Sequence, residues 1–184
     1  AEETLVKALE EPTPLALQVA AAMLAQQGHH DEAIAEGERA IALDPNDPDS
    51  YMALANALSL AGHPGKALGL VERAMRLNPH YPQWYLYELG LARFGTEEFD
   101  NAVITLEKAT ALNPNDRWTA RLLISAYGHL GRVKKAATVM DAAESSWRGM
   151  DPLSVTSIAF WYPFKEPQDA ERLADGLRKA GGPE

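Results

Sequence analysis

The fold is decided by residues 81–115, YPQWYLYELGLARFGTEEFDNAVITLEKATALNPN. Apolar and small residues fall at helical spacing in this stretch, which predicts one helix, a turn, a second helix and a stop at Pro114. Two earlier segments end in the same way, on Asp-Pro and on Asn-Pro. Because Pro45, Pro79 and Pro114 are 34 and 35 residues apart, the sequence indicates an array of helical repeats.

The same offsets recur along most of the chain. Small residues that let paired helices approach closely stand at Ala21, Ala55 and Gly90 on the first helices and at Ala33, Ala67, Ala102 and Ala136 on the second. We predict a short helix or linker at 1–13, repeats at 14–47, 48–81 and 82–116, a degenerate repeat at 117–150 and capping helices at 151–184. Neighbouring repeats should build a single elongated all-α domain between them.

The residues in phase resemble the tetratricopeptide repeat (TPR) family, whose first helix carries a large residue, Leu-Gly and an aromatic, and whose second carries Ala, an aromatic, Ala and Pro. The resemblance covers roughly residues 14–148. It implies a right-handed superhelix of antiparallel helix pairs with a C-terminal capping helix. Two residues depart from the pattern, since Gly37 replaces a large core residue and Arg93 stands where a tyrosine is expected.

Three short segments narrow the resemblance. They are PFKEP at 163–167, AERLADGLRKAG at 170–181, and YPQWY at 81–85 followed by Leu89-Gly90. These segments are similar to TPR regions attached to bacterial class III adenylate or guanylate cyclases, which implies an accessory region of a bacterial signalling protein. The chain starts with Ala1 and not with Met, so we expect it to be either trimmed or a processed product, and to come from a longer protein.

Composition disfavours several functions. The net charge of −9 disfavours binding to nucleic acid, so we expect no nucleic-acid partner. The longest apolar runs are far shorter than the ~20 residues of a membrane span, so we expect no membrane insertion. His29 and His30 are adjacent and should point apart, and neither a phosphate loop nor a patterned Ser-His-Asp set is present. We expect no enzyme activity, no metal and no cofactor. The absence of cysteine leaves the compartment open; we expect the cytoplasm, with the periplasm as the alternative.

The face of each first helix that points away from its partner helix is the candidate binding surface. At about 100° per residue, that face is opposite to the one carrying Leu17 and Ala21. In the TPR family it lines the concave groove. The candidate groove residues are Gln18, Met52, Asn56, Trp84, Tyr87, Leu91, Phe94, Trp118, Arg121 and Ser125.

Trp84 and Trp118 have the same offset in successive repeats, which favours them as anchors for an extended or helical peptide, and Arg121 could pair with a carboxylate. The alternative for both tryptophans is filling gaps between repeats. We therefore expect a protein–protein interaction scaffold with a protein or peptide partner. The clamp that binds chaperone C-termini is disfavoured, because residues such as Met52 and Leu91 stand where that clamp has Lys, Asn and Arg. Self-assembly into a homo-oligomer, through exposed apolar ends or the groove, is the alternative function; Trp147 and the aromatic residues within 160–164 suggest it.

Overall fold

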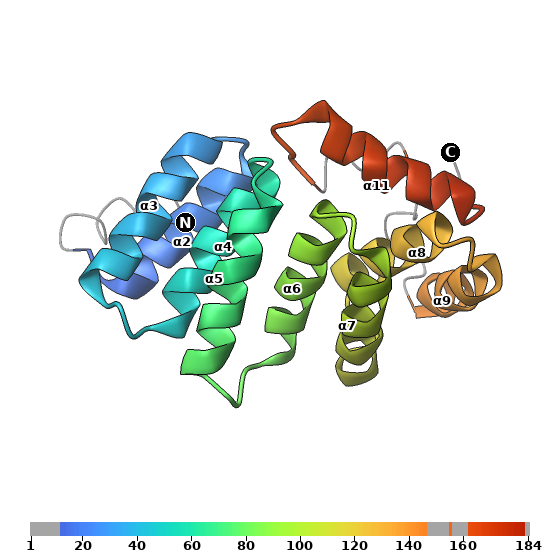
Figure 1. The fold of residues 1–184 in the computed structure, drawn as a ribbon, viewed down its shortest axis with the longest axis horizontal. Coiled ribbons are helices and arrows are strands. Elements are labelled where there is room, and N and C mark those ends of the chain that lie inside the picture. The colour runs from blue at the N-terminus through green and yellow to red at the C-terminus, as the bar shows by residue number, and fades with distance from the viewer. Residues whose placement is uncertain (1–11, 147–154, 156–161, 183–184) are drawn as a thin grey trace.

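The computed structural model describes residues 12–146, 155 and 162–182, and all regular elements among them are helices. The helices are α2 (Pro14–Gln26), α3 (His30–Leu43), α4 (Pro48–Leu60), α5 (Pro64–Leu77), α6 (Gln83–Gly95), α7 (Phe99–Leu112), α8 (Arg117–His129), α9 (Val133–Ser146) and α11 (Pro167–Lys179). Helices α2 to α9 form consecutive antiparallel pairs that stack in chain order (Figure 1). The predicted all-α fold is confirmed. Most of the predicted N-terminal segment and of residues 147–161 lies outside the described residues.

Local sequence signals start and stop the helices. Proline is an early helical residue in α2, α4, α5 and α11, where its missing N–H has no intrahelical partner. The side chains of Thr13, Asp47 and Asp116 cap α2, α4 and α8 by accepting a hydrogen bond from a backbone N–H in the first turn. These caps place the first helix of three repeats in the same way.

The turn inside each helix pair needs a residue with positive φ. Gly28, Gly62 and Gly131 supply it at φ of 80°, 83° and 65°. In the third pair this place is taken by Glu97, with φ of 62°. A residue with a Cβ is strained in this conformation, so the third turn is the least favourable one locally.

The two departures from the repeat pattern have a structural explanation. A Cβ on Gly37 would lie 3.0 Å from the Cα of Leu54, so the missing side chain lets α3 approach the backbone of α4. Arg93 donates a hydrogen bond from Nη1 to Thr105 Oγ1 at 2.5 Å and thereby joins α6 to α7. Both residues therefore serve contacts between neighbouring helices.

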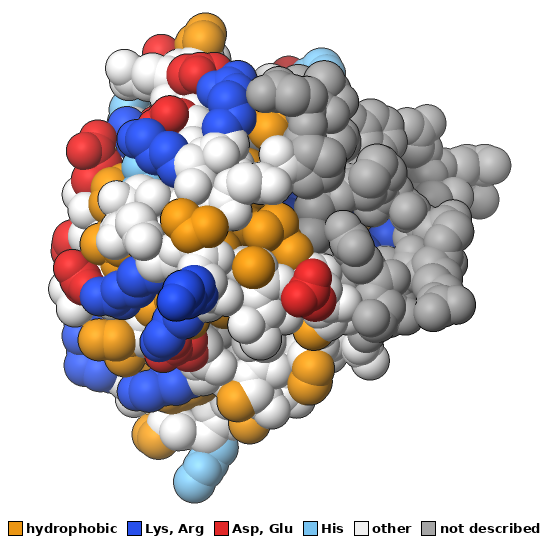
Figure 2. Space-filling view, turned by 90° about the vertical axis from the view of Figure 1, so that its right-hand side faces the viewer, with side chains coloured by type: hydrophobic (Ala, Val, Ile, Leu, Met, Phe, Trp, Pro, Cys, Tyr) orange, Lys and Arg blue, Asp and Glu red, His pale blue; other side chains and the backbone are white. Residues whose placement is uncertain are grey.

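The C-terminal end of the stack is formed by α9, which packs on α8. Ion pairs at its start reach back to α7, from Arg132 to Asp100 at 2.6 Å and from Lys135 to Glu107 at 2.9 Å. Figure 2 looks onto this end and shows that charged side chains are interspersed with apolar ones on its described part.

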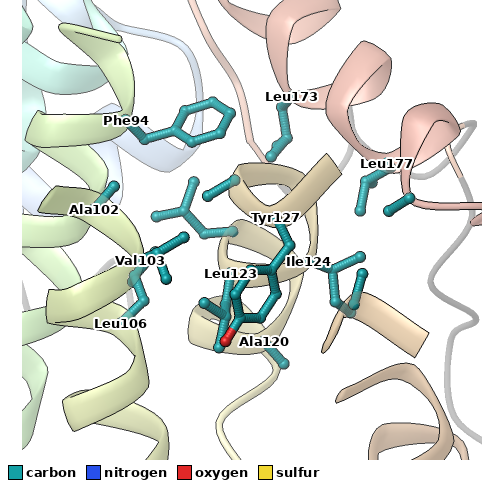
Figure 3. Close-up of a cluster of buried hydrophobic side chains, with 14 of the residues drawn as sticks. Phe94, Ala102, Val103, Leu106, Ala120, Leu123, Ile124, Tyr127, Leu173 and Leu177 are labelled. Carbon is teal, nitrogen blue, oxygen red and sulfur yellow. The ribbon is translucent and has the colours of Figure 1, made fainter. Parts of the chain in front are cut away.

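The last helix, α11, crosses the array. The sequence predicts a cap over the open end of the fourth repeat. Helix α11 packs on α8, and the residues before it reach back to α3 and α4: Lys165 Nζ lies 2.7 Å from Asp31, and Lys165 N donates to Leu60 O at 2.8 Å. In Figure 1 it runs along the upper ends of the helices. Leu173 and Leu177 of α11 join a core cluster with Phe94, Leu123 and residues of α7 (Figure 3).

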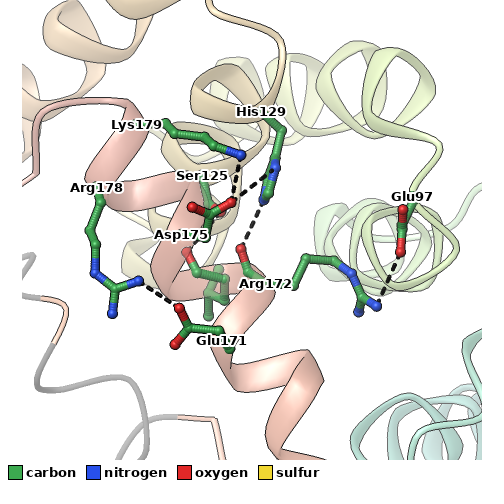
Figure 4. A network of polar contacts seen from close by, with 9 residues as sticks. Glu97, Ser125, His129, Glu171, Arg172, Asp175, Arg178 and Lys179 are labelled. Atoms are coloured by element: carbon green, nitrogen blue, oxygen red, sulfur yellow. Dashed lines mark hydrogen bonds and ion pairs between the residues drawn. The ribbon is translucent and has the colours of Figure 1, made fainter.

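Two glycines set the distance between α8 and α11. A Cβ on Gly128 would lie 1.9 Å from Gly176 O, so the two backbones touch at this crossing. Beside it, Ser125 Oγ donates to Leu173 O at 2.9 Å and His129 Nε2 donates to Arg172 O at 2.8 Å (Figure 4). Both carbonyls belong to a helix interior, which fixes the register of α11 on α8.

Candidate functional site

An open groove of about 510 Å³ lies on the concave side of the array. Side chains from α2, α4, α6 and α8 line it: Leu15, Gln18, Val19, Ala22, Gln26, Asp49, Met52, Ala53, Asn56, Trp84, Tyr87, Glu88 and Trp118. Each of the first three helices contributes residues three or four positions apart, which share one helix face. The groove is therefore built from the N-terminal halves of the later helices and most of α2.

The polar residues of α2 and α4 are held by contacts between the repeats. Gln18 Nε2 donates to Ser50 Oγ at 2.9 Å and also to Asp47, the N-cap of α4. Gln83, at a different offset in its repeat, makes a similar contact two repeats later, where its Nε2 donates to Asp116 Oδ2 at 3.3 Å. A glutamine near the start of one first helix thus binds the cap of the next, which keeps the groove walls in register.

Aromatic side chains form the far wall of the groove. Trp84 is 40% exposed and contacts Tyr85 edge-on, with ring centroids 4.5 Å apart. Trp118 contacts Tyr162 edge-on at 5.1 Å, and the Tyr162 hydroxyl donates to Trp118 O at 3.0 Å. Neighbouring rings therefore support both tryptophans, and both still line the groove.

The groove also contains a buried carboxyl group. Glu88 on α6 is 7% exposed, and its Oε1 accepts a hydrogen bond from Asn56 Nδ2 at 2.9 Å. Within the described part of the chain, Oε2 has no hydrogen-bond partner. Burial raises the pKa of Glu88 to about 8, although the hydrogen bond from Asn56 acts in the opposite direction.

The structure divides the residues that the sequence placed in the groove. Gln18, Met52, Asn56, Trp84, Tyr87 and Trp118 line it. The other four, Leu91, Phe94, Arg121 and Ser125, are buried outside it. The expectation that they face an open groove is wrong, and α11 with the residues before it explains the difference.

The C-terminal segment fills the half of the concave face that these four residues occupy. Leu91 and Phe94 border a small cavity together with Phe164 and Arg172. Ser125 donates a hydrogen bond to a backbone carbonyl of α11. Arg121 is only 2% exposed, which removes it from the surface available to a partner's carboxylate.

Sequence reasoning missed Glu88 as a lining residue, whereas helical spacing also places Leu15 and Asp49 on the groove face, where they lie. Glu88 follows Trp84 by four residues, so helical spacing from the tryptophan could have found it. The acidic residue type gave no indication of a buried position, because carboxylates are seldom buried.

Two further classes of site were sought in the described residues. No group of three or more His, Cys, Asp or Glu that could hold a metal ion occurs in 12–146, 155 and 162–182. None of the helices described there is long and apolar enough to span a bilayer.

Stacked antiparallel helix pairs with a concave groove define a helical repeat protein. Family models of the tetratricopeptide repeat match residues 24–91 and residues 85–116, which together make up half of the chain. The chain is a tetratricopeptide repeat protein. No curated protein matches the sequence.

Several solved structures share the fold. The TPR protein TTC0263 from Thermus thermophilus has a TM-score of 0.67 and 24% identity, over 95% of this chain and 87% of that chain. YrrB, described as a TPR protein with an unusual peptide-binding site, has a TM-score of 0.61 and 21% identity, over 98% and 92%. The first TPR domain of Spaghetti (RPAP3), bound to the HSP90 peptide SRMEEVD, has a TM-score of 0.56 and 24% identity, over 64% and 93%.

Proposed function

We propose that this chain is a protein–protein interaction scaffold that binds a peptide segment of its partner in the groove between α2 and α8. The observation that carries the proposal is the open groove of about 510 Å³, which has the size of a ligand site and aromatic side chains on its wall. YrrB has an unusual peptide-binding site and RPAP3 binds an HSP90 peptide, which supports this use of the fold.

Exposed apolar side chains also indicate that the groove is the binding surface. Leu15, Val19 and Trp84 are 67%, 43% and 40% exposed, and all three line the groove. Their exposure costs free energy that a bound apolar side chain would recover, at roughly 25 cal/mol per Å² of apolar surface removed from water. A cluster of this kind marks an interaction site more strongly than the same residues scattered singly.

Two more specific hypotheses, a signalling role and self-assembly, rest on the sequence alone. An accessory role in a bacterial signalling protein stays a prediction from the tail segments at 163–167 and 170–181. Self-assembly also stays a prediction, but two of the aromatics that suggested it are used inside the chain. Tyr162 is buried, and Phe164 packs against the core. Trp147, Phe160 and Trp161 lie outside the described residues.

A matched pair of leucines tests the groove. Leu15 lines it, whereas Leu112 is the last residue of α7 and lies elsewhere on the surface; they are 67% and 68% exposed. The protein is first used to select 12-residue peptides from a random phage-displayed library. The affinity of one selected peptide is then measured by fluorescence anisotropy for the wild type, Leu15→Ala and Leu112→Ala.

Leu15→Ala should weaken binding about fivefold, since it removes roughly 1 kcal/mol of apolar contact, and Leu112→Ala should leave it unchanged. If no peptide is selected, or if both variants bind as tightly as the wild type, the groove is not the peptide site.

A further inference from the structure

The groove holds an acidic group that the fold itself leaves incompletely bonded. Glu88 is one of the groove-lining residues, and its buried Oε2 has no hydrogen-bond partner among the described residues, while Oε1 accepts a hydrogen bond from Asn56. A buried polar atom without a partner costs about 1–3 kcal/mol, so a ligand group that completes its hydrogen bonding would recover that free energy. Once Glu88 is ionised, the missing partner must be a hydrogen-bond donor.

Charge in the groove indicates what kind of donor fits. The lining includes two carboxylates, Glu88 and Asp49, and among its described residues there is no Lys, Arg or His. Asp49 is engaged, since it accepts a hydrogen bond from the Tyr85 hydroxyl. An incoming cation would therefore meet complementary charge and would find the free oxygen on Glu88.

The aromatic wall adds a second contact for a cation. Trp84, Tyr87 and Glu88 follow one another at helical spacing on α6, so the rings and the carboxyl group share one face. Indole and phenol faces attract ammonium and guanidinium groups, and they also pack against the methylene stem of a lysine or arginine. Neither contact is offered to a carboxylate ligand.

We propose that the groove selects partner peptides carrying a lysine or arginine, whose cation lies against the Glu88 carboxylate while its aliphatic stem lies along Trp84. This inference rests on the peptide-binding function proposed above and names the residue type that the site recognises. Such a site is the reverse of one in which basic side chains bind an acidic peptide.

Binding of the cation requires ionised Glu88, whose proton passes to the buffer. The titratable groups that interact with it electrostatically are Tyr87 on α6 and Tyr162, and Asp49 on α4 lines the same groove; Arg121 on α8 lies near Tyr162. Burial raises the pKa of Tyr87 and Tyr162, so they keep their protons above pH 8. Because burial places the pKa of Glu88 at about 8, affinity should rise about tenfold from pH 6 to 7 and then level off above pH 8.

The first experiment uses the same random 12-residue peptide library at pH 8.5 with the wild type, Glu88→Gln and Glu72→Gln. Glu72 is an exposed residue of α5, and its variant makes the same change in net charge away from the groove. The wild type and Glu72→Gln should enrich Lys or Arg at one peptide position, and Glu88→Gln should lose that enrichment. Selection of peptides without basic residues, or with Asp or Glu, overturns this inference and leaves peptide binding intact; selection of no peptide overturns both.

The second experiment needs no variant of the protein for its main comparison. One selected peptide is compared with a copy in which norleucine replaces the basic residue, which keeps the stem and removes the charge. Wild-type affinity should fall at least about tenfold at pH 8.5 and less at pH 6.5. On Glu88→Gln, shown to be folded by its melting temperature, the same replacement should cost less than about threefold. An equal loss on both proteins, or no loss on the wild type, refutes the role of Glu88.

Discussion

Replacing Gly128 by alanine tests the crossing of α8 and α11. The new Cβ would lie 1.9 Å from Gly176 O and 3.0 Å from Ala180 N, and both atoms belong to the backbone of α11 and its C-terminal cap. No side-chain rotation can relieve such a contact, so α11 has to move away from α8. The movement would stretch the bonds from Ser125 to Leu173 O and from His129 to Arg172 O.

The expected loss of stability is large for a one-carbon change. Overpacking costs about 1–3 kcal/mol, and a contact with backbone belongs at the upper end, so we expect about 3 kcal/mol or more. For a chain of this length this loss lowers the melting temperature by roughly 6–12 °C. The matched control is Gly69→Ala on α5, where a Cβ meets nothing within 4 Å. Its better helix propensity should raise stability by about 0.5–1 kcal/mol.

Urea unfolding followed by far-ultraviolet circular dichroism measures both variants, and amide hydrogen exchange reports on α11 alone. We expect a lower transition midpoint for Gly128→Ala, together with faster exchange in Leu173–Leu177. If Gly128→Ala is as stable as the wild type or gains stability like Gly69→Ala, the backbones of α8 and α11 do not touch in solution.

Three other substitutions have defined outcomes. Burial raises the pKa of Glu88 to about 8, so unfolding releases a proton between pH 5 and 8 and stability falls there as pH rises; Glu88→Gln should flatten this slope by up to about 1.4 kcal/mol per pH unit, measured by urea unfolding across that range. Glu97→Gly relieves the positive φ of the third turn and should add about 0.5–1 kcal/mol, even with its exposed ion pair to Arg172 lost; an unchanged midpoint would contradict strain at Glu97. Asp116→Ala removes the cap of α8 and should cost about 1 kcal/mol in thermal unfolding; an unchanged melting temperature would contradict a stabilising role of this cap.

The sequence predicts the repeats well because their contacts are local and periodic. Alanine and glycine at repeated offsets encode the approach of one helix to the next, as Gly90 shows, where a Cβ would lie 2.4 Å from Leu106 Cδ2. Six candidate groove residues reach the groove for the same reason, since helical spacing alone fixes their face.

The remaining features depend on contacts that do not recur from one repeat to the next. Phe94 and Ser125 have the correct helical phase for an open groove, but they are covered by a segment that comes about 50 to 70 residues later in the chain. The burial of Glu88 likewise depends on its neighbours across the groove, Asn56 among them. Nothing in the spacing of residues on one helix reveals either partner.

The link between Lys165 and the start of the array changes how such a protein should unfold. Repeat arrays usually carry contacts between neighbours only, so that an end repeat can fray while the others persist. Here Lys165 N binds Leu60 O, and Lys165 Nζ lies 2.7 Å from Asp31, a residue 134 positions away in the chain. With α11 docked on α8, this contact closes a ring of covalent chain and packed helices. The intervening helix pairs should then melt together, and the last step of folding should be the slow closure of a loop more than a hundred residues long.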